Sequence, residues 1–129
     1  MAKQFNPKWI TQGADKEMTE FASEKANEIR NLETTQFRNI YGEIKRIQSN
    51  YEQNSASVFL LKPKVAYACA RAQGYKKQLL RKFKDEVFDK AIDFATDKEK
   101  YSNFCSYIEA ILAYHRFFSD KEVNKENKN

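Results

Sequence analysis

The segment DKEKYSNFCSYIEAILAYHRFF, residues 97–118, decides the fold, because its apolar side chains recur at helical spacing on more than one face. One broad stripe consists of Phe104, Cys105, Ile108, Ile111 and Leu112. Three aromatic side chains lie outside that stripe: Tyr107, Tyr114 and Phe117. A helix that is apolar nearly all round is either central in a bundle or covered by a partner. We therefore expect Tyr107, Tyr114 and Phe117 to form a protein interface with another copy or subunit.

Two more helices are predicted in the first half of the chain. Residues 14–29 and residues 34–51 each carry apolar side chains at steps of three and four, which is typical of a helix with one buried face. Thr34 and Thr35 are candidate N-caps of the second helix. Residues 50–57 are polar and predict a loop.

Two helices are also predicted between this loop and residue 97. Proline disfavours the α region for the residue before it, so a helix is expected to begin near Pro63. Gly74 is a plausible end of that helix. Residues 75–96 then form a long helix whose expected inward side chains are Leu80, Phe83, Val87, Ala91 and Phe94. Asp97 is the predicted cap of the last helix.

Taken together, residues 1–129 predict an all-α fold, a single compact bundle of about five helices. The chain is 41% hydrophobic, which is enough for a real core, and it has only 3 Gly and 2 Pro, too few for a many-stranded sandwich or barrel. Residues 1–13 are expected to be irregular, and residues 119–129 to be a disordered polar tail. No membrane span or signal peptide is expected, and the predicted location is cytoplasmic.

The positive charge is concentrated in the middle of the chain. The net charge is +5, yet residues 34–96 contain 12 basic and 6 acidic side chains, an excess of +6. No acid occurs between Gln53 and Lys84. Helical spacing sorts the central cations into stripes, which we interpret as a surface for a polyanion such as RNA. The candidate RNA-binding residues are Arg38, Lys45, Arg46, Lys62, Lys64, Arg71, Lys77 and Arg81.

Most catalytic chemistry is absent from the sequence. There is no Gly-rich phosphate loop, and the single histidine, His115, excludes a two-histidine nuclease and a His-rich metal site. His115 is interpreted as a satisfied core histidine, and Cys69 and Cys105 as buried free thiols. The sequence therefore predicts no enzyme, no metal and no cofactor.

One run of residues carries a resemblance to a known family. FLLKPKVAYA, residues 59–68, with Arg71 after it, resembles the signature of the small subunit of the type III-A CRISPR effector, the Csm complex. TTQFRNIY, residues 34–41, resembles the opening of that family's second helix, and residues 104–115 resemble its last helix. The chain departs from the family by having Cys69-Ala70 where a glycine often precedes the arginine.

The resemblance implies a non-catalytic helical bundle that acts in antiviral defence. Its expected partners are guide RNA and target RNA, the other subunits of the Csm complex and further copies of itself, stacked as a filament; no membrane is expected. Contact to RNA would run through the sugar-phosphate backbone, because sequence is read by base pairing.

Two alternatives remain open at this stage. One is a helical protein–protein adaptor whose cations are only a solvated face, and which would show no salt-dependent retention of RNA. The other is an enzyme that uses His115, whose turnover would be abolished by His115→Ala.

Overall fold

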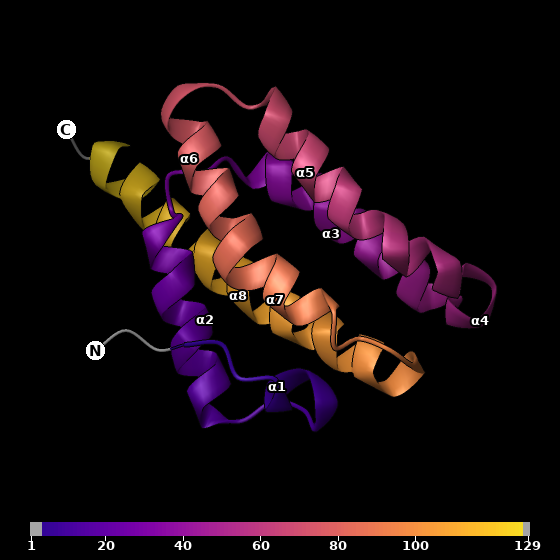
Figure 1. The fold of residues 1–129 in the computed structure, drawn as a ribbon. Helices are drawn as coiled ribbons and strands as arrows, with labels where there is room; N and C mark the ends of the chain where they lie inside the picture. Colours follow the sequence, from indigo (N-terminus) through magenta and orange to yellow (C-terminus); the bar gives the residue numbers. More distant parts are fainter. Residues whose placement is uncertain (1–3, 128–129) are drawn as a thin grey trace.

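The computed structural model describes residues 4–127, with side chains as far as residue 119. Its centre is the long helix α8 (Lys98–Asn127), which contacts α1, α2, α3 and α7 (Figure 1). Asp97 caps this helix as expected, since its carboxylate accepts a hydrogen bond from the backbone N–H of Lys100 at 2.8 Å. The described residues form an all-α bundle with no strand, which confirms the predicted fold class.

The first helices cover one side of α8. The helix α2 (Lys16–Glu28) begins at Asp15, whose side chain accepts from the N–H of Met18 at 2.8 Å. Residues 1–13 are not irregular throughout, as we had expected, because α1 (Lys8–Thr11) forms one helical turn there. Burial stabilises this turn: Trp9 and Ile10 are both buried, and Asn103 of α8 donates to the carbonyl of Ile10 at 2.9 Å.

The next segment crosses to the other side of α8. The helix α3 (Thr34–Ser49) begins where Thr34 and Thr35 predicted it, although no side-chain cap forms there. The expected loop at residues 50–57 is instead helical, since α4 (Tyr51–Asn54) and the 3-10 helix η1 (Ser55–Leu60) follow directly. Within it, the ring of Tyr51 packs at a tilt against the buried ring of Tyr101, with 5.6 Å between centroids, a contact that the local sequence does not reveal.

The remaining helices form the outer layer beside α3. The helix α5 (Leu61–Arg71) begins two residues before Pro63, and it runs alongside α3 (Figure 1). Gly74 has a φ of +61°, which a glycine adopts without strain, and this lets the chain reverse into α6 (Gly74–Phe83). The π-helical turn η2 (Lys84–Phe88) and α7 (Asp89–Ile92) continue α6, so the helix predicted over residues 75–96 forms but ends at Ile92.

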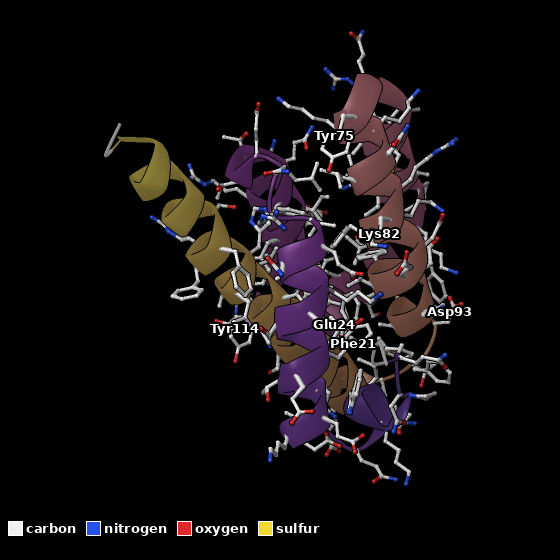
Figure 2. All side chains as sticks on the ribbon, turned by 90° about the vertical axis from the view of Figure 1, so that its left-hand side faces the viewer. Phe21, Glu24, Tyr75, Lys82, Asp93 and Tyr114 are labelled. Atoms are coloured by element: carbon white, nitrogen blue, oxygen red, sulfur yellow. The ribbon has the colours of Figure 1, made fainter. Side chains whose placement is uncertain are left out.

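Tyr107 does not belong to the expected protein interface, because its side chain is completely buried within this chain. An aromatic cluster of Phe5, Trp9 and Phe21 packs against its ring, with centroid distances of 5.6, 6.3 and 6.1 Å. Its hydroxyl donates to the carbonyl of Val87, in the π-helical turn, at 2.9 Å. Figure 2 shows Phe21 on α2, one of these covering side chains. Tyr107 is therefore a core residue.

Two smaller expectations also differ from the structure. Phe94 was expected to face inward, but it is 36% exposed because the helix ends at Ile92. Its ring lies beside that of Phe5, with 6.1 Å between centroids. The helix α8 continues to Asn127, past the expected start of the tail at residue 119. Residues 128 and 129 of that tail lie outside the described part.

The buried polar groups agree with the sequence analysis. His115 is 1% exposed, its Nε2 lies 3.0 Å from the carbonyl oxygen of Leu32, and its ring packs on Phe37. Cys69 and Cys105 are buried free thiols, and burial raises the pKa of both. These residues belong to the core.

Candidate nucleic-acid interface

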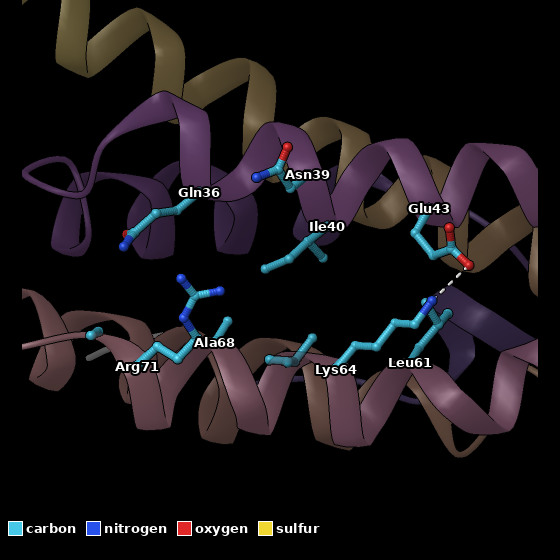
Figure 3. Close-up of a pocket in the computed structure, with 10 residues that line it drawn as sticks. Gln36, Asn39, Ile40, Glu43, Leu61, Lys64, Ala68 and Arg71 are labelled. Atoms are coloured by element: carbon cyan, nitrogen blue, oxygen red, sulfur yellow. Dashed lines mark hydrogen bonds and ion pairs between the residues drawn. The ribbon is translucent and has the colours of Figure 1, made fainter.

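A groove of about 480 Å³ lies between α3 and α5 (Figure 3). Apolar side chains form its floor, and polar or charged side chains line its two edges. The lining residues from α3 are Gln36, Asn39, Ile40 and Glu43. Those from α5 and the residue after it are Leu61, Lys64, Val65, Ala68, Arg71 and Ala72. The sequence placed Lys64 and Arg71 on one helix face, and both lie on the α5 edge of this groove.

At one end of the groove, an acid of the protein partly neutralises the positive charge. The Nζ of Lys64 lies 3.0 Å from a Glu43 oxygen, and Arg46 binds the same carboxylate through two nitrogens at 2.7 and 3.0 Å. Hydrogen bonds from Arg46 and Lys64 lower the pKa of Glu43 to about 2. The carboxylate is therefore charged at neutral pH, and a phosphate must compete with it for these two cations.

The other end of the groove keeps its positive charge. Arg71 faces the α3 side near Gln36 (Figure 3), and no carboxylate pairs with it among the described residues. Its guanidinium carbon lies 5.6 Å from the centre of the Tyr67 ring, a cation–π distance. The Oε1 of Gln36 is buried without a hydrogen-bond partner in the described chain. This end thus offers a cation, an exposed ring and an unused acceptor.

Lys62 lies on the opposite edge of α5 from Lys64, since two positions correspond to about 200° around a helix. There its Nζ lies 2.7 Å from a carboxylate oxygen of Asp93, just after α7. Figure 2 places Asp93 at the far end of the α6–α7 segment from Tyr75, with Lys82 between them. Lys62 is therefore spatially separate from the groove that holds Lys64 and Arg71.

The structure divides the eight candidate RNA-binding cations into two groups. Lys62, Lys64 and Arg46 are paired with acids. The others have no acid partner within residues 4–119: Arg38, Lys45, Arg71, Lys77 and Arg81.

The three predicted basic stripes do not merge into one surface. Arg38 is two positions from Gln36 and so lies on the side of α3 away from the groove. Lys45 shares that side, where its Nζ lies 6.0 Å from the Tyr41 ring and bonds the amide of Gln48. Lys77 and Arg81 lie four residues apart on α6, beyond the α5–α6 turn.

Two exposed apolar residues were missed by the sequence analysis. Phe59 and Leu60 are 82% and 54% exposed. Tyr67 and Tyr75, which lie among the cations of the same acid-free segment, are also exposed, at 64% and 61%. The sequence does indicate the exposure of Leu60, because Leu60 lies at helical spacing from Lys64, Tyr67 and Arg71 and so shares their side of the helix.

Other chemistry is not assembled in the described residues. They hold no cluster of three or more His, Cys, Asp or Glu side chains that fits a metal ion. The acids of α6–α7 pair with lysines instead: Glu86 with Lys25 at 2.6 Å, and Asp89 with Lys84 at 2.7 Å. None of the described helices is long and apolar enough to cross a membrane.

Fold and surface thus define a small all-α protein with a cation-edged groove. The chain matches the family model described as Csm2 Type III-A over residues 12–121, and it belongs to this family. The protein is accordingly a small subunit of the type III-A CRISPR effector complex. The match includes α2, a segment for which the sequence alone gave no resemblance. Comparison with curated proteins and with solved structures finds no significant match.

Proposed function

We propose that this small subunit is a non-catalytic, RNA-contacting scaffold of the Csm complex. It contacts guide RNA and target RNA through the sugar-phosphate backbone, without base specificity, and its copies stack as a filament beside the other subunits. It acts in the cytoplasm, in antiviral defence. The charge distribution described above supports the RNA contact, whereas stacking, location and the defence role are proposed from membership of the family.

The observation that carries the proposal is the set of cations without acid partners along α5 and α6. Arg71, Lys77 and Arg81 all lie in the segment from Gln53 to Lys84, which contains no acid. None of the three has a carboxylate partner in the described part of the chain. Cations that the protein does not neutralise gain the most from phosphates, because binding releases the condensed counterions of the RNA.

The experiment replaces Arg71, Lys77 and Arg81 together with Ala and measures RNA affinity against salt concentration. Three phosphate contacts give a log–log slope of about −2, from roughly 0.7 per contact on a single strand. The triple variant should flatten the slope and weaken binding equally for unrelated RNA sequences. Its helical content should persist, because Ala favours helix.

The control replaces Lys121, Lys125 and Lys128, near the C-terminus, which should change RNA affinity little. Normal RNA binding by the triple variant, together with loss of binding by the control, would place the RNA surface elsewhere. Reproducible, metal-dependent cleavage of RNA or DNA by the purified chain would contradict the non-catalytic role.

A protein–protein adaptor remains the second candidate, favoured by the exposure of Phe59 and Leu60. An adaptor of this kind would assemble with other subunits normally and retain no RNA in a salt-dependent way. The same salt titration therefore separates the two functions.

A further inference from the structure

One ridge of α5 combines apolar and basic side chains in alternation. Leu60, Lys64, Tyr67 and Arg71 follow each other at steps of four, three and four, which places them on one side of the helix. Its two cations, Lys64 and Arg71, line the groove between α3 and α5, and α5 contains no acid. Tyr67 is the most exposed of its apolar members, at 64%.

We propose that this ridge binds unpaired RNA, with a nucleobase stacked on the ring of Tyr67 and with Arg71 and Lys64 bound to the adjoining phosphates. The inference rests on the proposed function and extends it, because backbone contact alone needs no aromatic side chain. It predicts a preference for unpaired nucleotides over a duplex, whose bases are already stacked on each other.

The geometry of Tyr67 and Arg71 supports stacking. The guanidinium carbon of Arg71 lies 5.6 Å from the ring centre, so the cation and the ring occupy neighbouring positions one helical turn apart. In such a pair the ring stacks on a nucleobase while the cation binds the phosphate attached to that base's nucleotide. Both the tyrosine ring and the guanidinium are flat, and both stack on nucleobases.

Charge favours RNA over a second copy of the chain. Leu60 and Tyr67 are separated by cations, so two such ridges facing each other would bring like charges together. The one acid across the groove, Glu43, already binds both Arg46 and Lys64, so these three groups together are net positive. An anionic partner with flat faces fits both features of the ridge.

The test compares the full-length wild-type chain with the variant Tyr67→Ala in fluorescence anisotropy. The probes are a labelled oligouridine, an abasic oligonucleotide of the same length and an RNA duplex. Tyr67→Ala should weaken oligouridine binding at least about 5-fold, the lower bound for one stacked base, and leave duplex and abasic binding within about twofold. Tyr67→Phe, which keeps the ring, should bind as the wild type does.

Two further variants distinguish stacking on Tyr67 from the effect of a nearby charge and from the effect of any exposed aromatic ring. Arg71→Ala should make the salt slope shallower by about 0.7, whereas Tyr67→Ala should leave it unchanged, since only the arginine binds phosphate. Phe59→Ala is the matched control, an exposed aromatic side chain about 100° off the ridge, and should leave oligouridine binding unchanged.

Each outcome distinguishes this inference from the proposed function. Salt-dependent RNA binding that Tyr67→Ala does not weaken would overturn stacking and leave the RNA-contacting role intact. An equal loss of oligouridine affinity in Phe59→Ala would also overturn stacking. Loss of self-association by Tyr67→Ala, with RNA affinity unchanged, would make the ridge a protein interface. A wild-type chain that binds no RNA would overturn both proposals.

Discussion

Lys64 of α5 donates a hydrogen bond from Nζ to Oε1 of Glu43 on α3, at 3.0 Å across the groove. Arg46 binds the same carboxylate, so one acid engages two of the cations assigned to RNA. Glu43 is 21% exposed at its side chain, and it is the acid nearest to the basic ridge of α5 on the groove wall. It therefore limits the positive potential at that end of the groove.

Replacing Glu43 with Gln should strengthen RNA binding. The amide keeps the shape of the side chain but no longer neutralises Lys64 and Arg46, so both become available to phosphates. The salt slope should steepen by about 0.7, because the loss of one acid leaves one more unit of positive charge for phosphate. Affinity against salt concentration is the measurement.

Glu52→Gln is the matched control for this variant. Glu52 pairs with Lys98 at 3.0 Å in an exposed position and does not line the groove, so RNA affinity should hold. A Glu43→Gln chain that binds RNA more weakly than the wild type would mean that the carboxylate positions the two cations rather than competing for them.

Much of the fold could be predicted because it depends on local periodicity. The stripe Met18, Phe21, Ala22, Ala26 and Ile29 is buried as a unit, since α2 needs only one apolar face to pack on α8. Asp97 gave the start of α8 for the same reason, because a cap is a contact over three residues. Spacing over a few positions sufficed in both cases.

The features that the sequence did not predict depend on contacts between residues far apart in the chain. Tyr107 lies outside the main stripe of its helix, and the aromatic cluster of Phe5, Trp9 and Phe21, from the N-terminal segment and α2, covers it. Likewise, nothing local distinguishes Lys64, paired with Glu43 across 21 positions, from Arg71, which is seven positions away and has no such partner in the described residues. Periodicity identifies a face of a helix but not what covers it.

Removing the hydroxyl of Tyr107 should destabilise the fold. Tyr107→Phe leaves the buried carbonyl of Val87 without its 2.9 Å hydrogen bond, which should lower the free energy of unfolding by about 1–3 kcal/mol. Urea unfolding monitored by circular dichroism measures this. Tyr114→Phe should have no comparable effect, because the Tyr114 hydroxyl makes no hydrogen bond within the described residues. Equal stability of the Tyr107 variant and the wild type would argue against this bond.

The remaining part of the expected protein interface is on the outer side of α8. Phe117 is 57% exposed, and Tyr114 is partly buried (Figure 2). We expect Tyr114→Glu and Phe117→Glu to reduce weak self-association at high protein concentration, since a charge opposes burial of this surface against a second copy. Light scattering of the two variants and the wild type provides the measurement. A strictly monomeric wild type, together with full assembly of the Csm complex by both variants, would exclude this surface as an interface.

His115 should make the protein less stable below about pH 6.5. Because a carbonyl oxygen only accepts hydrogen bonds, Nε2 carries the proton in its 3.0 Å contact with Leu32. Burial lowers the pKa of His115 in the folded state, and the hydrogen bonds to backbone carbonyls only partly oppose this. As the pH falls through 6.5, the ordinary value, the unfolded chain takes up a proton that the folded chain does not. The unfolded state is thereby favoured, so the free energy of unfolding should fall by up to about 1.4 kcal/mol per pH unit.

Urea titrations between about pH 5.5 and pH 7.5 test this. This pH window lies above the ordinary pKa values of carboxylates. His115→Gln retains an N–H donor but does not titrate, so its stability should change less over the same window. The variant also separates the core role of His115 from the enzymatic alternative, in which its loss would abolish a reaction rate. If wild type and His115→Gln lose stability in parallel as the pH falls, the buried imidazole is not the group responsible.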